Sequence, residues 1–93
     1  MKVGIRIPGA GPWAGPDAIT EIAQFAEKVG FDSLWMTDHV ALPTKVETPY
    51  PYTADGKFLW APETPYLDCL TSLTWAAAAT EKMELGTSCL ILP

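Results

Sequence analysis

The sequence predicts an α/β fold in which parallel strands alternate with helices, and three observations predict it. Val3, Ile5 and Ile7 recur at the two-residue period of a strand. An apolar pattern of helical period then leads to Gly30. A nearly continuous apolar run follows at 33–37, as in a strand covered on both faces. A second helical pattern and a third strand complete the order β-α-β-α-β, with helices as crossovers between parallel strands.

The first half of the chain divides into a strand, a loop and a helix. We expect the strand over residues 2–8 and the loop over 9–16, because three glycines and two prolines interrupt regular structure there. Asp17 is expected to cap the helix, and Gly30 to end it in the left-handed conformation with Phe31 folding back on the last turn. The expected buried face comprises Ile19, Ile22, Ala23, Ala26 and Val29.

In the second half, the second strand is expected to end at Asp38 and His39. Residues 40–63 form a long βα connection whose four prolines and several aromatic side chains favour a packed lid over a disordered linker. Thr64 followed by Pro65 predicts the start of a second helix that ends near Thr80. Its expected buried face comprises Leu67, Leu70, Leu73, Thr74, Ala77 and Ala78, and a third strand is expected over 83–91.

Two architectures fit this order of elements. An open doubly wound sheet carries helices on both faces, whereas a barrel has helices outside and packed side chains inside. Gly4 and Arg6 share one side of the first strand and are poor residues for lying under a helix, which favours the barrel. Barrel strands follow sequence order, 1-2-3, whereas a flavodoxin-like sheet places strand one between strands two and three.

Charge and composition limit the partners. Eleven acidic against six basic residues give a net charge of −5, which offers no attraction for nucleic-acid phosphates or for anionic lipid. Neither nucleic acid nor a membrane is an expected partner, and the absence of a signal peptide or a long apolar segment predicts a cytoplasmic protein. Cys69 and Cys89 lack CxxC spacing and are expected to be reduced thiols.

Residues 9–14 formally fit the dinucleotide fingerprint G-x-G-x-x-G/A. That fingerprint works by aiming the N–H groups of a helix start at a pyrophosphate. Pro12 has no N–H, Pro16 interrupts any helix begun earlier, and the helical pattern starts only at Asp17. An ordinary βα loop is therefore favoured over a dinucleotide site.

Asp38 and His39 lie at the carboxyl end of the second strand, where parallel α/β proteins carry their chemistry. The imidazole of His39 can transfer a proton near neutral pH or hydrogen-bond a cofactor, and Asp38 can orient it. The alternative is a polar strand end that meets water. A metal site is not expected, because no second histidine or cysteine stands at ligand spacing.

Two further features have open interpretations. Gly86 within the third strand, followed by Thr87 and Ser88, indicates either a bulge where a ligand approaches closely or a simple bend. The four tryptophans are expected to be core or lid residues rather than cofactor-stacking ones: Trp13, Trp35, Trp60 and Trp75.

Three segments together resemble the bacterial luciferase-like family: Met1–Gly4, Gly30–His39 and Leu85–Pro93. The resemblance implies a (β/α)8 barrel of the TIM type. A complete barrel runs to about 250 residues, so residues 1–93 are expected to be the N-terminal portion of one barrel domain. Thr37-Asp38-His39 resembles the members that use a deazaflavin coenzyme of the F-420 type, whereas luciferase subunits tend to have Glu-His-His there.

The resemblance further implies an oxidoreductase that transfers hydride between a deazaflavin and a small organic substrate, with a homodimer as the full-length form. It makes His39 the catalytic residue beside the reacting ring and Asp38 a cofactor contact. Thr87, Ser88 and Cys89 would support the ring, often through a non-proline cis peptide. The alternatives are an FMN-dependent monooxygenase and a truncated, non-catalytic flavin-binding or structural protein.

Overall fold

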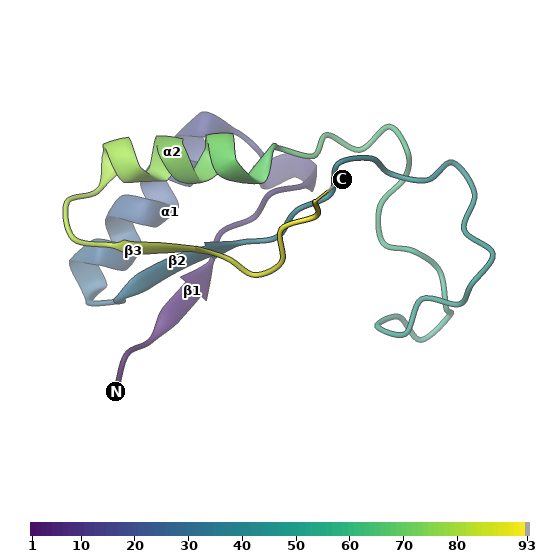
Figure 1. The fold of residues 1–93 in the computed structure, drawn as a ribbon, viewed down its shortest axis with the longest axis horizontal. Coiled ribbons are helices and arrows are strands. Elements are labelled where there is room, and N and C mark those ends of the chain that lie inside the picture. The colour runs from purple at the N-terminus through teal and green to yellow at the C-terminus, as the bar shows by residue number, and fades with distance from the viewer. Residues whose placement is uncertain (93) are drawn as a thin grey trace.

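A parallel sheet of three strands carries both helices on one face (Figure 1). The computed structural model describes residues 1–92. The elements are β1 (Gly4–Arg6), the short 3₁₀ helix η1 (Gly11–Trp13), α1 (Pro16–Val29), β2 (Ser33–Met36), α2 (Cys69–Ala79) and β3 (Glu84–Thr87). The strand order is β1-β2-β3 with both pairs parallel, which confirms the order predicted for a barrel. The structure therefore does not have the flavodoxin-like order, in which β1 would lie between β2 and β3.

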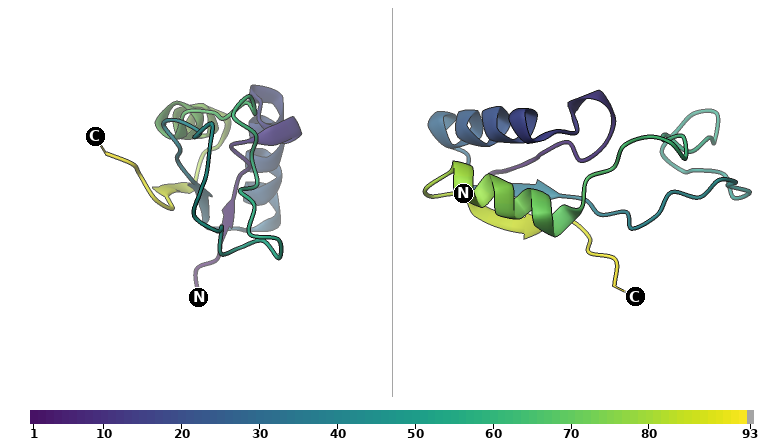
Figure 2. Two further views of the ribbon diagram at one scale, coloured as in Figure 1. Left: turned by 90° about the vertical axis from the view of Figure 1, so that its right-hand side faces the viewer. Right: turned by 90° about the horizontal axis from the view of Figure 1, so that it is seen from above.

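The core lies between the sheet and the two helices, which pack against each other (Figure 2). Ile7, Leu34 and Met36 of the sheet are fully buried against the small side chains of the helices. The longest dimension of the molecule is 43 Å against 27 and 26 Å for the others, because the connection between β2 and α2 extends away from the layers (Figure 1). This connection contains no helix or strand.

The strands are shorter than the predicted ranges 2–8, 33–38 and 83–91. Pairing continues for one residue past β1 and past β3, where the Ile7 amide donates to the Trp35 carbonyl at 2.9 Å and the Ser88 amide to the Met36 carbonyl at 2.8 Å. Pro8 then has no N–H to donate, and the chain bends at Ser88. Because both flanking segments turn away from the sheet at this point, no strand pairs with the chain beyond Met36 among residues 1–92.

The N-cap of helix α1 lies two residues earlier than predicted. Gly15 is its N-cap and Pro16 occupies the first turn, where the missing N–H of proline costs nothing. Asp17 is therefore not the cap but an acidic residue within the first turn, where it complements the helix dipole. The predicted end is confirmed, since Gly30 has a φ of 94° and the Phe31 amide donates to the Ala26 carbonyl at 3.0 Å.

The predicted buried face of α1 is confirmed except at its C-terminal end. Ile19, Ala23 and Ala26 are buried, and Ile22 is partly buried. Val29 was expected among them but is 52% exposed. At 3.6 residues per turn Val29 lies roughly 80° around the helix from Ile19, which is beyond the stripe that meets the sheet.

Helix α2 begins at Cys69, and the predicted start at Thr64 and Pro65 is wrong. Asp68 is the N-cap, and its carboxylate accepts a hydrogen bond from the Thr71 amide at 2.7 Å. This hydrogen bond lowers the pKa of Asp68. The residues before it are extended because they pair with the loop after β1: the Leu67 amide donates to the Gly9 carbonyl at 2.8 Å.

The predicted buried face of α2 is also wrong apart from Leu73. Leu70 is 54% exposed, and Thr74, Ala77 and Ala78 are exposed as well, while Leu67 precedes the helix and is partly buried. The buried residues are Cys69, Ser72, Leu73 and Ala76. Because α2 is apolar around most of its circumference, the pattern does not single out one face.

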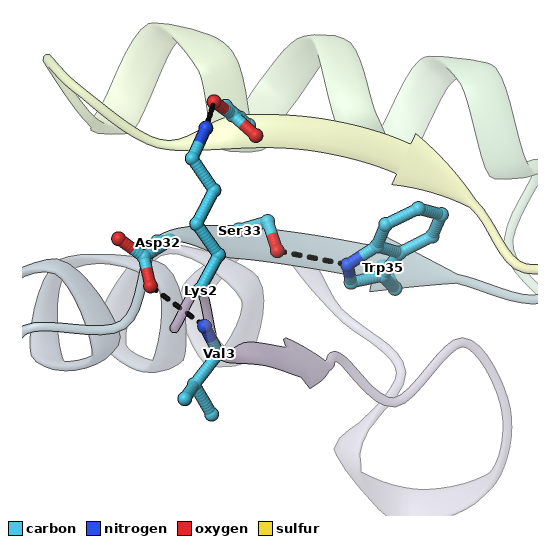
Figure 3. Close-up of polar contacts among 6 residues, drawn as sticks. Lys2, Val3, Asp32, Ser33 and Trp35 are labelled. Atoms are coloured by element: carbon cyan, nitrogen blue, oxygen red, sulfur yellow. Dashed lines mark hydrogen bonds and ion pairs between the residues drawn. The ribbon is translucent and has the colours of Figure 1, made fainter.

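The face of the sheet that the helices leave open is organised by Trp35 (Figure 3). Its indole N–H donates to the Ser33 hydroxyl at 2.9 Å. A Cβ added at Gly4 would lie 2.5 Å from the indole nitrogen, and one added at Gly86 would lie 2.6 Å from a ring carbon. The glycine in β3 therefore makes room for the Trp35 ring rather than for a bulge. Lys2 and Glu84 form an ion pair across the same sheet (Figure 3).

We predict that Gly86→Ala destabilises the protein by about 1–3 kcal/mol, because the added methyl group overpacks the Trp35 ring. Thermal unfolding of the protein expressed from its complete reading frame measures this change. Gly15→Ser is the control, since a Cβ at Gly15 has no atom within 4 Å and serine is a favoured residue at a helix N-cap. In a Trp35→Leu background the cost of Gly86→Ala should fall by more than half, and an unchanged cost would contradict the packing role.

Several large apolar side chains and one apolar groove are exposed to solvent. Phe25, Trp35 and Trp75 are exposed large side chains. A groove of about 610 Å³ runs beside β1 and α1, lined in part by Ile5 and Phe31. The outer edges of β1 and β3 have no strand partner among residues 1–92. Open edges and apolar faces of this kind pair with other chains.

We therefore predict that a protein consisting of residues 1–93 alone self-associates or melts without cooperativity at micromolar concentration. Analytical ultracentrifugation and thermal denaturation test this. A monomer with a sharp, reversible transition would contradict the prediction and would make these 93 residues a self-sufficient domain.

Candidate functional site

The carboxyl ends of the three parallel strands meet at one edge of the sheet, and three segments leave from it. These are the loop after β1, the long connection after β2 and the segment after β3 (Figure 1). Asp38 and His39 follow β2 after Thr37, whereas Thr87 ends β3 and Ser88 and Cys89 follow it. The structure thus brings all five residues predicted for the site to this edge.

Asp38 connects two of these segments. It is only 7% exposed, and its Oδ2 accepts a hydrogen bond from the Ile91 amide at 3.1 Å. The carboxylate therefore holds the segment after β3 against the end of β2. Ser88 and Cys89, which lie within the segment that Asp38 holds, are exposed. No peptide bond within residues 1–92 is cis, so the cis peptide that the family resemblance implies is not found here.

His39 lies among aromatic rings. Its ring centroid is 4.9 Å from that of Tyr66 and 6.0 Å from that of Phe58. Its Nδ1 is buried and has no hydrogen-bond partner within residues 1–92. The partner that the structure shows for Asp38 is the Ile91 amide, so the carboxylate does not orient the imidazole as the sequence suggested.

A buried polar atom without a partner is rare and costs free energy. Depending on its protonation, the Nδ1 of His39 can donate a hydrogen bond to a carbonyl group or accept one from an N–H group. Flavin and deazaflavin rings carry both kinds of group along one edge. The residues present therefore fit such a ring at this edge of the sheet.

Tyr66 lies at the candidate site, and sequence reasoning missed it. Its hydroxyl is hydrogen-bonded to the Thr37 hydroxyl at 2.9 Å, and its ring packs on His39. Its backbone forms an antiparallel bridge with Ala10 in the loop after β1. The predicted helix start at Thr64 placed Tyr66 inside a helix, which hid this role, and only its position after a proline-rich aromatic segment hinted at it.

A cleft of about 210 Å³ opens between the loop after β1 and the end of β2. Its lining includes Arg6, Trp13, Thr37, Trp60 and Tyr66. None of these belonged to the predicted site, because their contribution depends on the fold of two separate loops; Thr37 entered the sequence analysis only as part of the Thr37-Asp38-His39 pattern. The cleft adjoins His39 through their shared neighbour Tyr66.

The two glycines of the G-x-G motif serve the packing around this cleft. Gly11 has a φ of 77°, and a Cβ added there would lie 3.1 Å from the Trp60 ring. A Cβ at Gly9 would lie 2.7 Å from the Cε of Met36. Helix α1 starts only at Pro16, so the motif does not aim a helix start at a phosphate, in agreement with the favoured interpretation as a βα loop.

The two cysteines lie in different environments. Both are free, Cys69 buried and Cys89 exposed. Burial raises the pKa of the Cys69 thiol, and the charge of Asp38 raises it further, so this thiol stays protonated at neutral pH. Within residues 1–92 no group of three potential metal ligands comes together. Neither helix of that part of the chain has the length and apolar character that a membrane crossing requires.

The sequence is similar to uncharacterised proteins of mycobacteria. One from Mycobacterium tuberculosis and one from Mycobacterium bovis are each 28% identical to it over 72 residues, which cover 77% of this chain and 25% of the relative. The chain thus spans about a quarter of the length of these curated relatives. No solved structure matches it significantly.

The family model described as luciferase-like monooxygenase matches residues 1–93, the whole of the sequence. The parallel order β1-β2-β3, with both crossover helices on one face, agrees with the start of a (β/α)8 barrel. The chain belongs to the luciferase-like monooxygenase family, and its β-α-β-α-β unit is the first part of the barrel of that family.

Proposed function

We propose that this chain forms the first three strands of an oxidoreductase that transfers hydride between a deazaflavin coenzyme and a small organic substrate. The observation that carries the proposal is the buried, unpaired Nδ1 of His39 at the carboxyl edge of the sheet. Its sequence context, Thr37-Asp38-His39, resembles the deazaflavin-dependent members of the family. Such an edge is where barrels carry their catalytic residues.

His39, Tyr66 and Asp38 have different roles at this edge of the sheet. The Nδ1 of His39 would hold a bound flavin-type ring by a hydrogen bond, or would hold a proton during the reaction. Tyr66 fixes the plane of the imidazole, because its own ring is anchored by the hydroxyl contact to Thr37. Asp38 keeps Ser88 and Cys89 in place against the end of β2 through the Ile91 amide. When bound, the deazaflavin supplies or accepts the hydride.

An FMN-dependent monooxygenase is the second candidate, and the description of the matching family favours it. Both candidates use the same edge of the sheet and differ in the tricyclic ring it holds. A third candidate is a non-catalytic flavin-binding or structural protein of the same fold. The three candidates differ in which cofactor the protein should bind, and binding changes the visible absorbance of that cofactor.

Binding titrations separate the three candidates. The protein expressed from its complete reading frame is titrated with the deazaflavin coenzyme and with FMN, and the change in visible absorbance of each is followed. We expect saturable binding of the deazaflavin at least about tenfold tighter than that of FMN. Tighter binding of FMN would establish the monooxygenase candidate, and binding of neither would leave the non-catalytic one.

We predict that His39→Ala lowers turnover by about 10²-fold or more if the imidazole handles a proton. Turnover is measured by the bleaching of the visible band of the cofactor, with a substrate identified by screening on the wild-type protein. Cofactor affinity is measured on the same samples, and a loss confined to affinity would assign His39 to binding alone. Unchanged turnover and affinity would show that His39 is a strand-end residue without a functional role.

We also predict that Asp38→Ala weakens cofactor binding by about tenfold, because it releases the segment that contains Ser88 and Cys89. Asp38→Asn is the matched control. Its amide oxygen can still accept from the Ile91 amide, so its affinity should stay close to that of the wild type. If the two variants lose affinity equally, the charge of Asp38 rather than its hydrogen bond to Ile91 is what the cofactor needs.

A further inference from the structure

The cleft beside the candidate cofactor edge has a chemical character of its own. Arg6 is its charged lining residue, and no carboxylate is part of the lining. The guanidinium of Arg6 forms no ion pair with any residue in 1–92. Arg6 is exposed and also lines the groove beside α1, to which Glu21 belongs. In a chain with a net charge of −5, an arginine that lines a cleft without acidic residues still makes this part of the surface more positive than its surroundings.

The other walls of the cleft are flat and amphipathic. Trp13 and Trp60 line the cleft, as do Thr37 and Tyr66, whose hydroxyl groups are bonded to each other at 2.9 Å. Indole faces pack well on planar apolar groups. The planar guanidinium can hydrogen-bond both oxygens of a carboxylate at once.

The volume of the cleft limits what enters it. At about 210 Å³ it is smaller than the roughly 300–1,000 Å³ of a pocket that encloses a whole drug-sized ligand. It therefore suits one end of a molecule rather than all of it. Because Tyr66 both lines the cleft and packs on His39, a group bound here leaves the remainder of the molecule close to the imidazole.

We propose that this cleft binds the anionic end of the substrate, a carboxylate carried on a planar, conjugated or aromatic group, and that Arg6 determines this specificity. The inference deepens the proposed function, on which it rests only for the role of the bound molecule as a substrate. Arg6 is a specificity residue, whereas Trp13 and Trp60 supply the apolar walls. The glycines at positions 9 and 11 permit the close packing that shapes the cleft.

Benzoate and benzamide test the proposal, because they share shape and ring and differ in charge. Each is titrated into the protein expressed from its complete reading frame, without cofactor, and the indole N–H signals of Trp13 and Trp60 are followed by NMR. Trp13→Phe and Trp60→Phe assign these two signals. We expect benzoate to shift both and to bind at least about tenfold more tightly than benzamide, as a charge-assisted hydrogen bond provides.

Substitutions of Arg6 identify the cation responsible. Arg6→Gln should reduce the affinity for benzoate to that for benzamide, and Arg6→Lys should restore part of the difference. Lys28→Gln, which removes one positive charge from the exposed last turn of α1, is the matched control and should have no effect. Unfolding temperatures of all variants are compared, and Arg6→Lys serves as the test if Arg6→Gln does not fold.

Three results would overturn the proposal: equal affinities for the two probes, equal effects of the Arg6 and Lys28 substitutions, or no shift of either indole signal at millimolar benzoate. The titration uses no cofactor, so its outcome is independent of the proposed function. Selective benzoate binding in a protein that binds neither deazaflavin nor FMN would uphold the anion site and reject the oxidoreductase.

Discussion

The functional edge of this chain depends on the pairing of residues 65–67 with the loop after β1. The Gly11 amide donates to the Pro65 carbonyl at 3.3 Å, and the Leu67 amide donates to the Gly9 carbonyl at 2.8 Å. These bonds bring together two loops that leave different strands and are far apart in the sequence. They also place Tyr66 between them, where its hydroxyl contacts Thr37 and its ring contacts His39. Without this pairing neither the imidazole environment nor the cleft at Arg6 would exist.

A second constraint comes from Trp35 on the open face of the sheet. Its indole lies against Gly4 and Gly86, the positions on the neighbouring strands where a Cβ would collide with it. One bulky residue flanked by two glycines fills the layer that a closed barrel packs inside, which agrees with the alternation of large and small side chains in such interiors. The same arrangement explains why one face of the sheet carries no helix and why Trp35 is 42% exposed in this chain.

The features of the fold that follow from local chemistry could be predicted from the sequence. The strand positions follow from periodicity, and the barrel order was favoured by Gly4 and Arg6 on one side of β1. The C-terminal cap at Gly30 follows from the ease with which glycine adopts the left-handed conformation. The start and buried face of α2 could not be predicted, because an apolar helix has no distinct face and because residues 65–67 pair with a loop far away in sequence. Thr64 followed by Pro65 is a favourable local start for a helix, but residues 65–67 instead pair with the loop after β1, and α2 starts at Cys69.

The candidate site divides in the same way. Asp38 and His39 could be predicted because they directly follow a recognisable strand. Arg6, Trp60 and Tyr66 could not, since their roles arise only when the two loops meet over the end of β2. The hydrogen bond from the Ile91 amide to Asp38 could not be predicted from the sequence either, because it depends on how the chain bends after β3.

We propose that the carboxyl edge of β1, β2 and β3 holds a flavin-type ring against His39. A crystal structure of the protein from its complete reading frame, soaked with the deazaflavin, measures this directly. The account predicts the ring within contact of His39 and of Thr87–Cys89, with the Nδ1 of His39 hydrogen-bonded to the cofactor. A ring bound elsewhere in the barrel, or a ring at this edge with the Nδ1 of His39 still unpaired, would contradict the account.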